Sequence, residues 1–506
     1  MPSNASIQPG FLHRFVALAQ AYPEQWAIRH LDDPDSDLTY AQLLDRARRH
    51  KGAMQGAPGL HDGERVALIL PNGVDFIAFY LALLGSGAVP VILNCTLTGH
   101  EMAAVLQASQ ASLVVTLAAT ARRHASIFAA QGIRHCLLLD SPEESTGLPG
   151  NAVELRHLDD TPAELVLPEG NPLAAIQYTY RGLGRPLGVR HRYLDLTLSS
   201  DGLHEHFHPQ GVGSVHLVTL PLYAIFGLSV MLVFPLSIGA TLLMTNTLLK
   251  RDLPRLLSEH QVSFACLVPD VIRYFNGRLA KRKTERLPLH PRLMLYSGGS
   301  HLPAEEGERL AELLGCNPVR QGYGLTESLP VLVQSSLLPT SRGAMGEPIR
   351  GVELRVVDSL GRDVRPGRIG ELLLRGPMLM EQYDDEPEVT ARFVRDGWLH
   401  TGDLVWRDEA GQVFFYCQRL RISKIKAQMI DFSEIESIAL LHPHVSAARA
   451  YVVPDGSGTN VLHLAIQCRE AVSLGELNAL LAQHLSGFKL PRIIELAAPA
   501  EVRHVR

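Results

Sequence analysis

The sequence predicts an α/β fold in which parallel-rich sheets are covered by helices. Apolar strand-like runs alternate with amphipathic helical stretches, as in the strand at 65–70, the helix at 74–87 and the strand at 88–93. Strands that alternate with helices usually pair in parallel, and the helices then cover the sheet. The same alternation returns at 214–268 and 292–335, which predicts a large N-terminal domain of this kind.

The character of the sequence changes after about residue 340. Up to residue 416, short strand-like runs are separated by Gly and Asp-Arg turns, which indicates a small antiparallel or barrel-like subdomain at 340–416. Helical and strand-like segments then predict a small α+β unit. Because 506 residues exceed what one hydrophobic core usually serves, we expect an N-terminal domain of residues 1–416 and a small, mobile C-terminal domain of residues 417–506.

Composition and charge argue against several classes of partner. Lys and Arg number 47 against 52 Asp and Glu, so no basic excess favours a nucleic acid. The N-terminus lacks a basic region followed by a long apolar run, so we expect no signal peptide and a cytoplasmic location. The uncharged run 217–244 is long enough to cross a bilayer, but Pro221 and Pro235 interrupt it. We expect a buried strand–helix–strand unit there and no membrane span.

A glycine-rich segment, YTYRGLGRPLGV, occupies residues 178–189. It matches neither a P-loop nor a dinucleotide fingerprint, and by itself it predicts a tight turn between two strands. The segment nevertheless resembles the phosphate loop YTSGSTGxPKGV of the adenylate-forming superfamily, of the acyl-CoA synthetase or acyl-AMP ligase type. The positions that match the loop are Tyr178, Thr179, Gly184, Pro186, Gly188 and Val189, and His191 matches the His that follows it.

Several residues of this loop depart from the family pattern. Tyr180 and Arg181 stand where the family has Ser and Gly, and Leu187 replaces the Lys. Small residues let backbone N–H groups close around the β- and γ-phosphates, so these changes reshape the loop. Arg181 is strained if that position needs a positive φ. Arg181, Arg185 and Arg190 could restore positive charge, because a guanidinium binds phosphate in a fork geometry.

Two further motifs of the family are intact and in the expected order. They are GYGLTES at 322–328 and GWLHTGD at 397–403. The resemblance implies that Tyr323 packs on adenine, that Thr326 contacts phosphate and that Glu327 binds Mg²⁺. It also implies that Asp403 binds the ribose hydroxyls. The remaining positions that the resemblance assigns to nucleotide binding are Gly298, Gly299, Ser300 and Gly324.

The acyl pocket and the C-terminal part also resemble the family, with changes. LPLYAIFG at 220–227 is similar to LPLFHxxG with the His replaced, so we expect an apolar carboxylate pocket, although core packing is an alternative for each residue. The expected pocket residues are Tyr223, Ala224, Phe226, Gly227, Leu325 and Val331. Gln418 replaces the ribose-binding Arg, unless Arg419 reaches the ribose, and Ala427 replaces the Gly beside the pantetheine path.

The adenylation Lys of the family has no counterpart after Lys489, and Arg506 stands at the end of the sequence in its place. That Lys stabilises charge on the α-phosphate. The resemblance therefore implies that adenylation is slowed more than thioester formation.

Taken together, the motifs predict an enzyme that uses ATP and Mg²⁺ to activate a fatty or aromatic carboxylic acid as acyl-AMP. The acyl group then passes to a thiol of CoA or of a carrier protein. The residues expected to act in the reaction are Thr326, Glu327 and His191. Two alternatives stay open: a degenerate member that binds nucleotide or acyl ligand without efficient adenylation, and a ligase that uses an amine acceptor or a preformed acyl-AMP.

Overall fold

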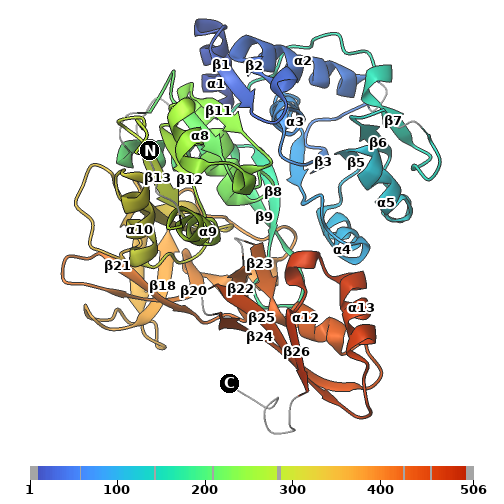
Figure 1. Cartoon of the computed structure of the whole chain (residues 1–506). Helices are drawn as coiled ribbons and strands as arrows, with labels where there is room; N and C mark the ends of the chain where they lie inside the picture. The colour runs from blue at the N-terminus through green and yellow to red at the C-terminus, as the bar shows by residue number, and fades with distance from the viewer. Residues whose placement is uncertain are drawn as a thin grey trace.

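The computed structural model describes residues 9–56, 59–141, 144–207, 210–281, 286–425, 428–455 and 459–496. Two large sheets covered by helices form the upper part of the molecule in Figure 1, and the C-terminal unit lies below them. The predicted α/β class is confirmed. None of the helices in these described ranges is both long and apolar enough to cross a bilayer.

The seven-stranded sheet has the order β7-β6-β5-β3-β4-β8-β9. All neighbours pair in parallel except β8 and β9, which form an antiparallel hairpin. Its strands are β3 (Arg65–Ile69), β4 (Val89–Ile92), β5 (Leu113–Thr116), β6 (His135–Leu138), β7 (Ala152–Glu154), β8 (Leu173–Thr179) and β9 (Leu187–Arg192). Three helices connect successive strands: α3 (Val74–Leu84), α4 (Gly99–Ser109) and α5 (Ala118–Ala130).

The nine-stranded sheet has the order β16-β15-β14-β13-β12-β10-β11-β1-β2. Its strands are β1 (Trp26–His30), β2 (Leu38–Thr39), β10 (Val215–Val218), β11 (Thr241–Met244), β12 (Phe264–Cys266), β13 (Met294–Ser297), β14 (Arg320–Leu325), β15 (Leu329–Val333) and β16 (Glu347–Pro348). The accompanying helices are α1 (Phe11–Ala21), α2 (Tyr40–Gln55), α6 (Tyr193–His206), α7 (Phe234–Ile238), α8 (Leu253–Glu259), α9 (Pro269–Leu279) and α10 (Ala304–Leu314).

The uncharged run 217–244 is a buried strand–helix–strand unit, as predicted. Parallel strands β10 and β11 flank a π-helix at Gly227–Val233 that continues into α7. The π-helix is fully buried in the main hydrophobic core. The apolar residues of the run 217–244 therefore pack between the sheet and the helices that cover it.

The segment after residue 340 forms an antiparallel sheet, as the turn pattern indicated. Its strands are β17 (Glu353–Val357), β18 (Gly370–Arg375), β19 (Val394–Arg395), β20 (Trp398–Arg407) and β21 (Val413–Gln418), with helix α11 at Pro387–Phe393. The C-terminal unit has its own apolar cluster. It contains β22 (Ile422–Ile425), β23 (Gln428–Asp431), α12 (Phe432–Ala439), β24 (Val445–Pro454), β25 (Asn460–Cys468), α13 (Leu474–His484) and β26 (Ile493–Leu496). The boundaries at 416 and 417 stay a prediction.

Three elements bring the recognised motifs together. The glycine-rich loop joins β8 to β9, the 322–328 motif begins in β14, and Asp403 lies within β20. In Figure 1 the β22–β23 hairpin of the C-terminal unit points up toward the ends of β8 and β9. The site therefore lies between the large sheets and the C-terminal unit, which we call the cap (residues 422–496).

Candidate active site

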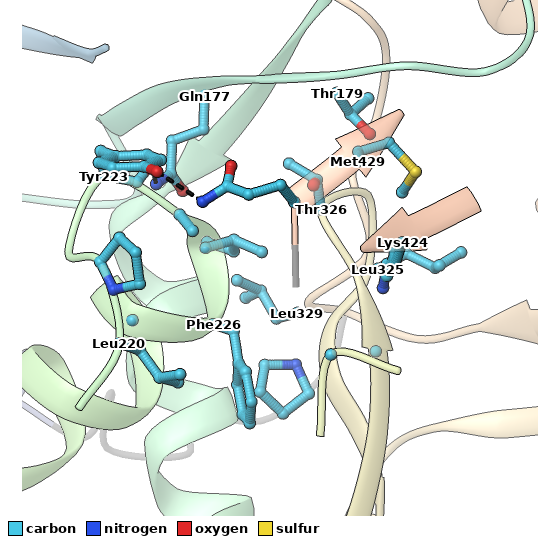
Figure 2. Close-up of a pocket in the computed structure, with 18 of the residues that line it drawn as sticks. Gln177, Thr179, Leu220, Tyr223, Phe226, Leu325, Thr326, Leu329, Lys424 and Met429 are labelled. Atoms are coloured by element: carbon cyan, nitrogen blue, oxygen red, sulfur yellow. Dashed lines mark hydrogen bonds between the residues drawn. The ribbon is translucent and has the colours of Figure 1, made fainter. Parts of the chain in front are cut away.

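An apolar cavity of about 150 Å³ lies beside the segment 220–227. Figure 2 shows its lining, with Leu220 and Phe226 at the bottom and Leu325 and Leu329 near the centre. Of the expected pocket residues, those that line it are Tyr223, Ala224, Phe226, Gly227 and Leu325. Val331 does not, because it lies in the fully buried strand β15 and packs in the core, while its neighbours Leu329 and Pro330 reach the cavity.

One side of this cavity is polar. Gln177 donates a hydrogen bond from Nε2 to the Tyr223 carbonyl oxygen at 2.7 Å, and Gln428 donates to the Tyr223 hydroxyl at 2.6 Å. The carbonyl partner fixes the Gln177 amide orientation, since only its NH₂ group can donate. Gln177 Oε1 then has no partner although the residue is only 1% exposed. The sequence signal, a lone Gln in the apolar strand LAAIQYT, was overlooked.

A second cavity of about 710 Å³ adjoins the first and lies between the antiparallel sheet and the cap. Tyr323 and Lys424 line both cavities, so the two cavities adjoin at these side chains. Gly299 and Gly324 also line both, and Ser300 lines the second. A Cβ on Gly324 would lie 2.2 Å from the Leu329 carbonyl oxygen, so the wall here requires glycine.

Asp403 and Tyr323 form a pair in this second cavity. The Tyr323 hydroxyl donates to Asp403 Oδ2 at 2.6 Å, and Asp403 Oδ1 is buried without a partner. Burial raises the pKa of Asp403, while the Tyr323 hydrogen bond opposes the rise. A buried acceptor without a donor costs free energy, so this oxygen suits a ligand hydroxyl. Gly298 stands next to this region, and a Cβ there would lie 2.7 Å from the Phe226 ring.

The glycine-rich loop curls through two glycines in the left-handed region, Gly182 at φ 76° and Gly184 at φ 72°. Arg181 is outside that region, so the expected strain is absent. Thr179 lines the apolar cavity, and the Gly188 carbonyl accepts from the Asp384 N–H at 2.8 Å. The loop thus turns at two glycines, the residue type that adopts a positive φ most readily.

Arg181 points into the protein and pairs with the residue expected to bind the metal. Its guanidinium donates to the carbonyl oxygens of Thr401 at 3.0 Å and His400 at 2.7 Å. Its Nε lies 3.6 Å from Glu327 Oε1, and both side chains are 2% exposed. The Tyr383 hydroxyl also donates to Glu327 Oε1, at 2.7 Å. Neither Arg181 nor Glu327 lines the two cavities, whereas Thr326 lines the first.

The other arginines that were expected at phosphate also face carboxylates. Arg185 lies 2.5 Å from Glu386, and Arg190 lies 3.1 Å from Asp384. Arg419, which was considered for the ribose, lies 3.5 Å from Glu371 and lines a separate cavity. Gln418, not Arg419, lines the nucleotide-sized cavity. The predicted charge compensation therefore takes the form of internal ion pairs in this conformation.

Lys424 is a site residue that the motif reading did not assign. It extends from β22 and lines both cavities (Figure 2). Burial lowers the pKa of Lys424, while the charges of Asp403 and Glu327 oppose that shift. No hydrogen bond or ion pair to Nζ occurs within the part of the chain that the structure describes. Lys426, Ala427 and Arg506 lie outside that part.

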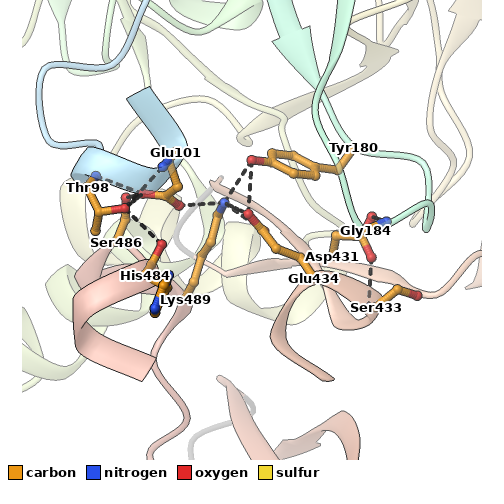
Figure 3. A network of polar contacts seen from close by, with 10 residues as sticks. All are labelled: Thr98, Glu101, Tyr180, Gly184, Asp431, Ser433, Glu434, His484, Ser486 and Lys489. Carbon is orange, nitrogen blue, oxygen red and sulfur yellow. Dashed lines mark hydrogen bonds and ion pairs between the residues drawn. The ribbon is translucent and has the colours of Figure 1, made fainter. Parts of the chain in front are cut away.

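Lys489 ties the cap to the glycine-rich loop and to α4. Its Nζ lies 2.7 Å from Glu101 Oε1, 2.8 Å from Glu434 Oε2 and 2.9 Å from the Tyr180 hydroxyl (Figure 3). Ser486 donates to Glu101, so a second cap residue joins the same carboxylate. Burial acts to lower the pKa of Lys489, but Tyr180, Glu434 and Glu101 outweigh it and raise that pKa. We call these residues with Ser486 the Lys489 network.

Replacing Lys489 with Met should lower the free energy of unfolding by about 3–5 kcal/mol, because it leaves Glu101 and Glu434 buried without their cation. Urea unfolding and limited proteolysis of the 417–421 connection would measure this. Lys250→Met, at an exposed lysine, is the matched control. Equal stability of Lys489→Met and the control would show that the network does not hold the cap.

His191 lies apart from both cavities. It is buried in β9, its Nε2 has no partner, and burial lowers the pKa of its imidazole to about 3. A neutral, enclosed imidazole fits a packing role in the hairpin that carries the loop. Its proximity to the loop in sequence therefore does not bring it to the cavities.

His191 should make the fold sensitive to acid. Its folded pKa, about 3, lies below the unfolded value near 6.5, so its stability contribution is present above pH 6.5 and is lost as the pH falls. Between pH 7 and 5 the loss should be about 2 kcal/mol. His191→Leu should remove that share of the pH dependence of urea unfolding, and His61→Leu, at an exposed site, should not. An unchanged slope in His191→Leu would contradict the buried neutral state.

Comparison with known proteins agrees with the motifs. The family model described as AMP-binding enzyme matches residues 15–384. The long-chain-fatty-acid–CoA ligase of Salmonella typhi is 26% identical over 516 residues, covering 95% of this chain and 91% of the relative.

Two solved structures share the fold. A double mutant of the o-succinylbenzoate CoA synthetase of Bacillus subtilis, bound to a product analogue, superimposes with a TM-score of 0.82 at 23% identity, covering 99% of this chain and 98% of that one. The amide bond synthetase of Marinactinospora thermotolerans gives 0.82 at 22% identity, covering 97% of each chain. At these sequence identities, the two comparisons show that the fold is shared.

Proposed function

The chain belongs to the AMP-binding enzyme family, and on that premise we propose that it is an AMP-forming ligase. It activates a carboxylic acid with ATP as acyl-AMP and transfers the acyl group to a thiol of CoA or of a carrier protein. The observation that carries this proposal is that the two cavities adjoin, with Tyr323 and Lys424 in the walls of both. An acid in the apolar cavity would meet a nucleotide in the larger one there.

Each side chain has a role that follows from its place. Asp403 Oδ1 would accept a ribose hydroxyl, and the Tyr323 ring with Gly299 would contact the base. Thr179 and Thr326, on the wall of the apolar cavity, would donate to the α-phosphate or to the acid carboxylate. Lys424 would stabilise negative charge where the two cavities join. Catalysis would then rest on positioning and electrostatics.

Enzymes of this family use ATP together with Mg²⁺. Glu327 is the family's metal ligand, but here its Oε1 already faces Arg181 and Tyr383. Mg²⁺ prefers oxygen ligands in octahedral geometry and does not fit beside a buried guanidinium.

The size of the apolar cavity limits which carboxylic acid can bind there. A dry apolar cavity of about 150 Å³ accommodates benzene in another protein, so a single ring or a similarly compact group fits here. Gln177 Oε1 is a buried acceptor that needs a donor. We propose that the acid is aromatic, has one ring and carries a hydroxyl that donates to Gln177. A long alkyl chain exceeds this space.

The acid preference can be measured by pyrophosphate release with hydroxylated benzoates, unsubstituted benzoate and decanoate. The hydroxylated ring should be preferred over benzoate by about tenfold in kcat/KM, because an unpaired buried acceptor costs about 1–3 kcal/mol. Gln177→Met should remove that preference, whereas Gln107→Met, at an exposed position on α4, should retain it. A preference for decanoate would contradict the compact pocket.

The ligase assignment itself is tested at Asp403. Asp403→Asn should weaken AMP binding by about 10- to 100-fold, because it removes a charged acceptor for the ribose. Calorimetry measures the binding, and mass spectrometry with CoA, pantetheinylated carrier protein or an amine identifies the acceptor. Asp363→Asn, at an exposed turn of the antiparallel sheet, is the control. Absence of nucleotide binding in the parent protein, or parental binding in Asp403→Asn, would exclude this assignment.

A further inference from the structure

We propose that the arrangement seen here, with the cap held against the glycine-rich loop, selects a nucleoside monophosphate ester, the acyl-adenylate, over ATP. This inference rests on the proposed function. Two protein groups, the Asp431 carboxylate and the Arg181 guanidinium, hold the places that the outer phosphates and their metal would take. An adenylate has only one phosphate, so it leaves both groups where they are.

The first group is Asp431, which fills the anion-binding face of the glycine-rich loop. The Gly184 N–H donates to Asp431 Oδ2 at 3.0 Å, and the Ser433 N–H donates to Oδ1 at 2.8 Å (Figure 3). Gly182 and Gly184 both have positive φ, a backbone form that turns N–H groups toward an anion. A carboxylate thus accepts from the loop where a phosphate oxygen otherwise would.

The Asp431 side chain is well held in this place. It is fully buried and caps the N-terminus of α12. Burial raises the pKa of Asp431, and the backbone N–H groups around it, including that of Gly182, oppose the rise. An incoming β- or γ-phosphate would therefore compete with a resident anion and would be repelled by its charge.

The second group is Arg181, which stands beside Glu327. All its partners, namely Thr401, His400, Glu327 and Phe393, belong to the N-terminal part of the chain. The pair therefore makes no contact with the cap, whereas Asp431 belongs to the cap. A divalent cation at Glu327 would lie next to a fixed guanidinium with little water to screen the repulsion.

The Lys489 network explains why Asp431 stays in the loop. Tyr180, the first residue of the loop, and Glu434, three residues after Asp431, both contact Lys489 Nζ. Glu101 on α4 contacts the same nitrogen. The loop, the start of α12 and α4 are thus joined around one buried cation, and the cap is held with Asp431 against Gly184.

Such a site suits acyl transfer from the adenylate. The thiol sulfur forms a bond to the acyl carbon, the bond from that carbon to the phosphate oxygen breaks, and AMP leaves with the electron pair. The thiol proton passes to solvent. The products are a thioester, AMP and a proton, and neither a triphosphate nor a metal takes part.

Calorimetry with AMP and ATP, each with Mg²⁺ or with EDTA, tests the selectivity on the full chain. The parent should bind AMP at least about tenfold more tightly than ATP, and EDTA should leave the AMP affinity unchanged. Asp431→Ser keeps a helix-capping hydroxyl but is one atom shorter, so it should raise ATP affinity toward that of AMP. Asp252→Ser, the same change at the N-cap residue of α8, should keep the difference between AMP and ATP affinity that the parent shows.

Metal binding gives a readout that does not depend on activity. Arg181→Ala should gain Glu327-dependent Mn²⁺ binding, seen by electron paramagnetic resonance, and the gain should vanish in Arg181→Ala with Glu327→Gln. Arg14→Ala, which breaks another partly buried ion pair with Asp201, should gain none. If Arg181→Ala fails to fold, the parent should still show no Mn²⁺ binding.

The outcomes separate this inference from the proposed function. ATP·Mg²⁺ binding to the parent as tightly as AMP, or tight Mn²⁺ binding to the parent, would overturn the inference and leave the ligase assignment intact. Equal ATP affinity of Asp431→Ser and the parent would also overturn it. Absence of binding of either nucleotide would instead remove the proposed function on which the inference rests.

Discussion

One buried ammonium group, that of Lys489, fixes the relation between the cap and the large sheets. It offsets two carboxylates from different parts of the chain, Glu101 and Glu434, and it also contacts Tyr180. Buried charges are tolerated only when they are paired. The cap, α4 and the glycine-rich loop therefore cannot separate unless the charges of Lys489, Glu101 and Glu434 become exposed to water or are neutralised. The closed cavity, the position of Lys424 and the contact of Asp431 with the loop all depend on this arrangement.

The site combines the intact motifs that contain Tyr323 and Asp403 with an altered set of charges in the glycine-rich loop. Gly182 and Gly184 turn the loop through positive φ angles, Tyr323 pairs with Asp403, and Gly298 lies against Phe226. Its arginines are instead directed at internal carboxylates, as in the pair of Arg181 with Glu327. A fold of this kind can therefore keep adenosine recognition while it loses affinity for outer phosphates. Acyl transfer from an adenylate needs the recognition of adenosine and does not need affinity for outer phosphates.

The sequence predicted the features that depend on local periodicity and on contiguous motifs. The alternation of strands and helices, the buried run 217–244 and the convergence of Tyr323 with Asp403 all followed from it. The directions of the side chains did not follow from the sequence, because they are set by contacts with distant parts of the chain. Arg181 turned inward to carbonyl oxygens of β20, and Val331 faced the core, although both lie next to residues that line or border the site. Lys424 and Asp431 reach the site only through the placement of the cap, which no local pattern encodes.

The central claim is that this closed site takes acyl-adenylate through contacts that need no metal. Single-turnover thioester formation from a synthetic hydroxybenzoyl-adenylate and CoA or pantetheinylated carrier protein, in excess EDTA, tests it most directly. The account predicts that thioester and AMP appear in equal amounts at the same rate with and without EDTA. It is contradicted if no thioester forms from the adenylate while the free acid with ATP and Mg²⁺ yields it.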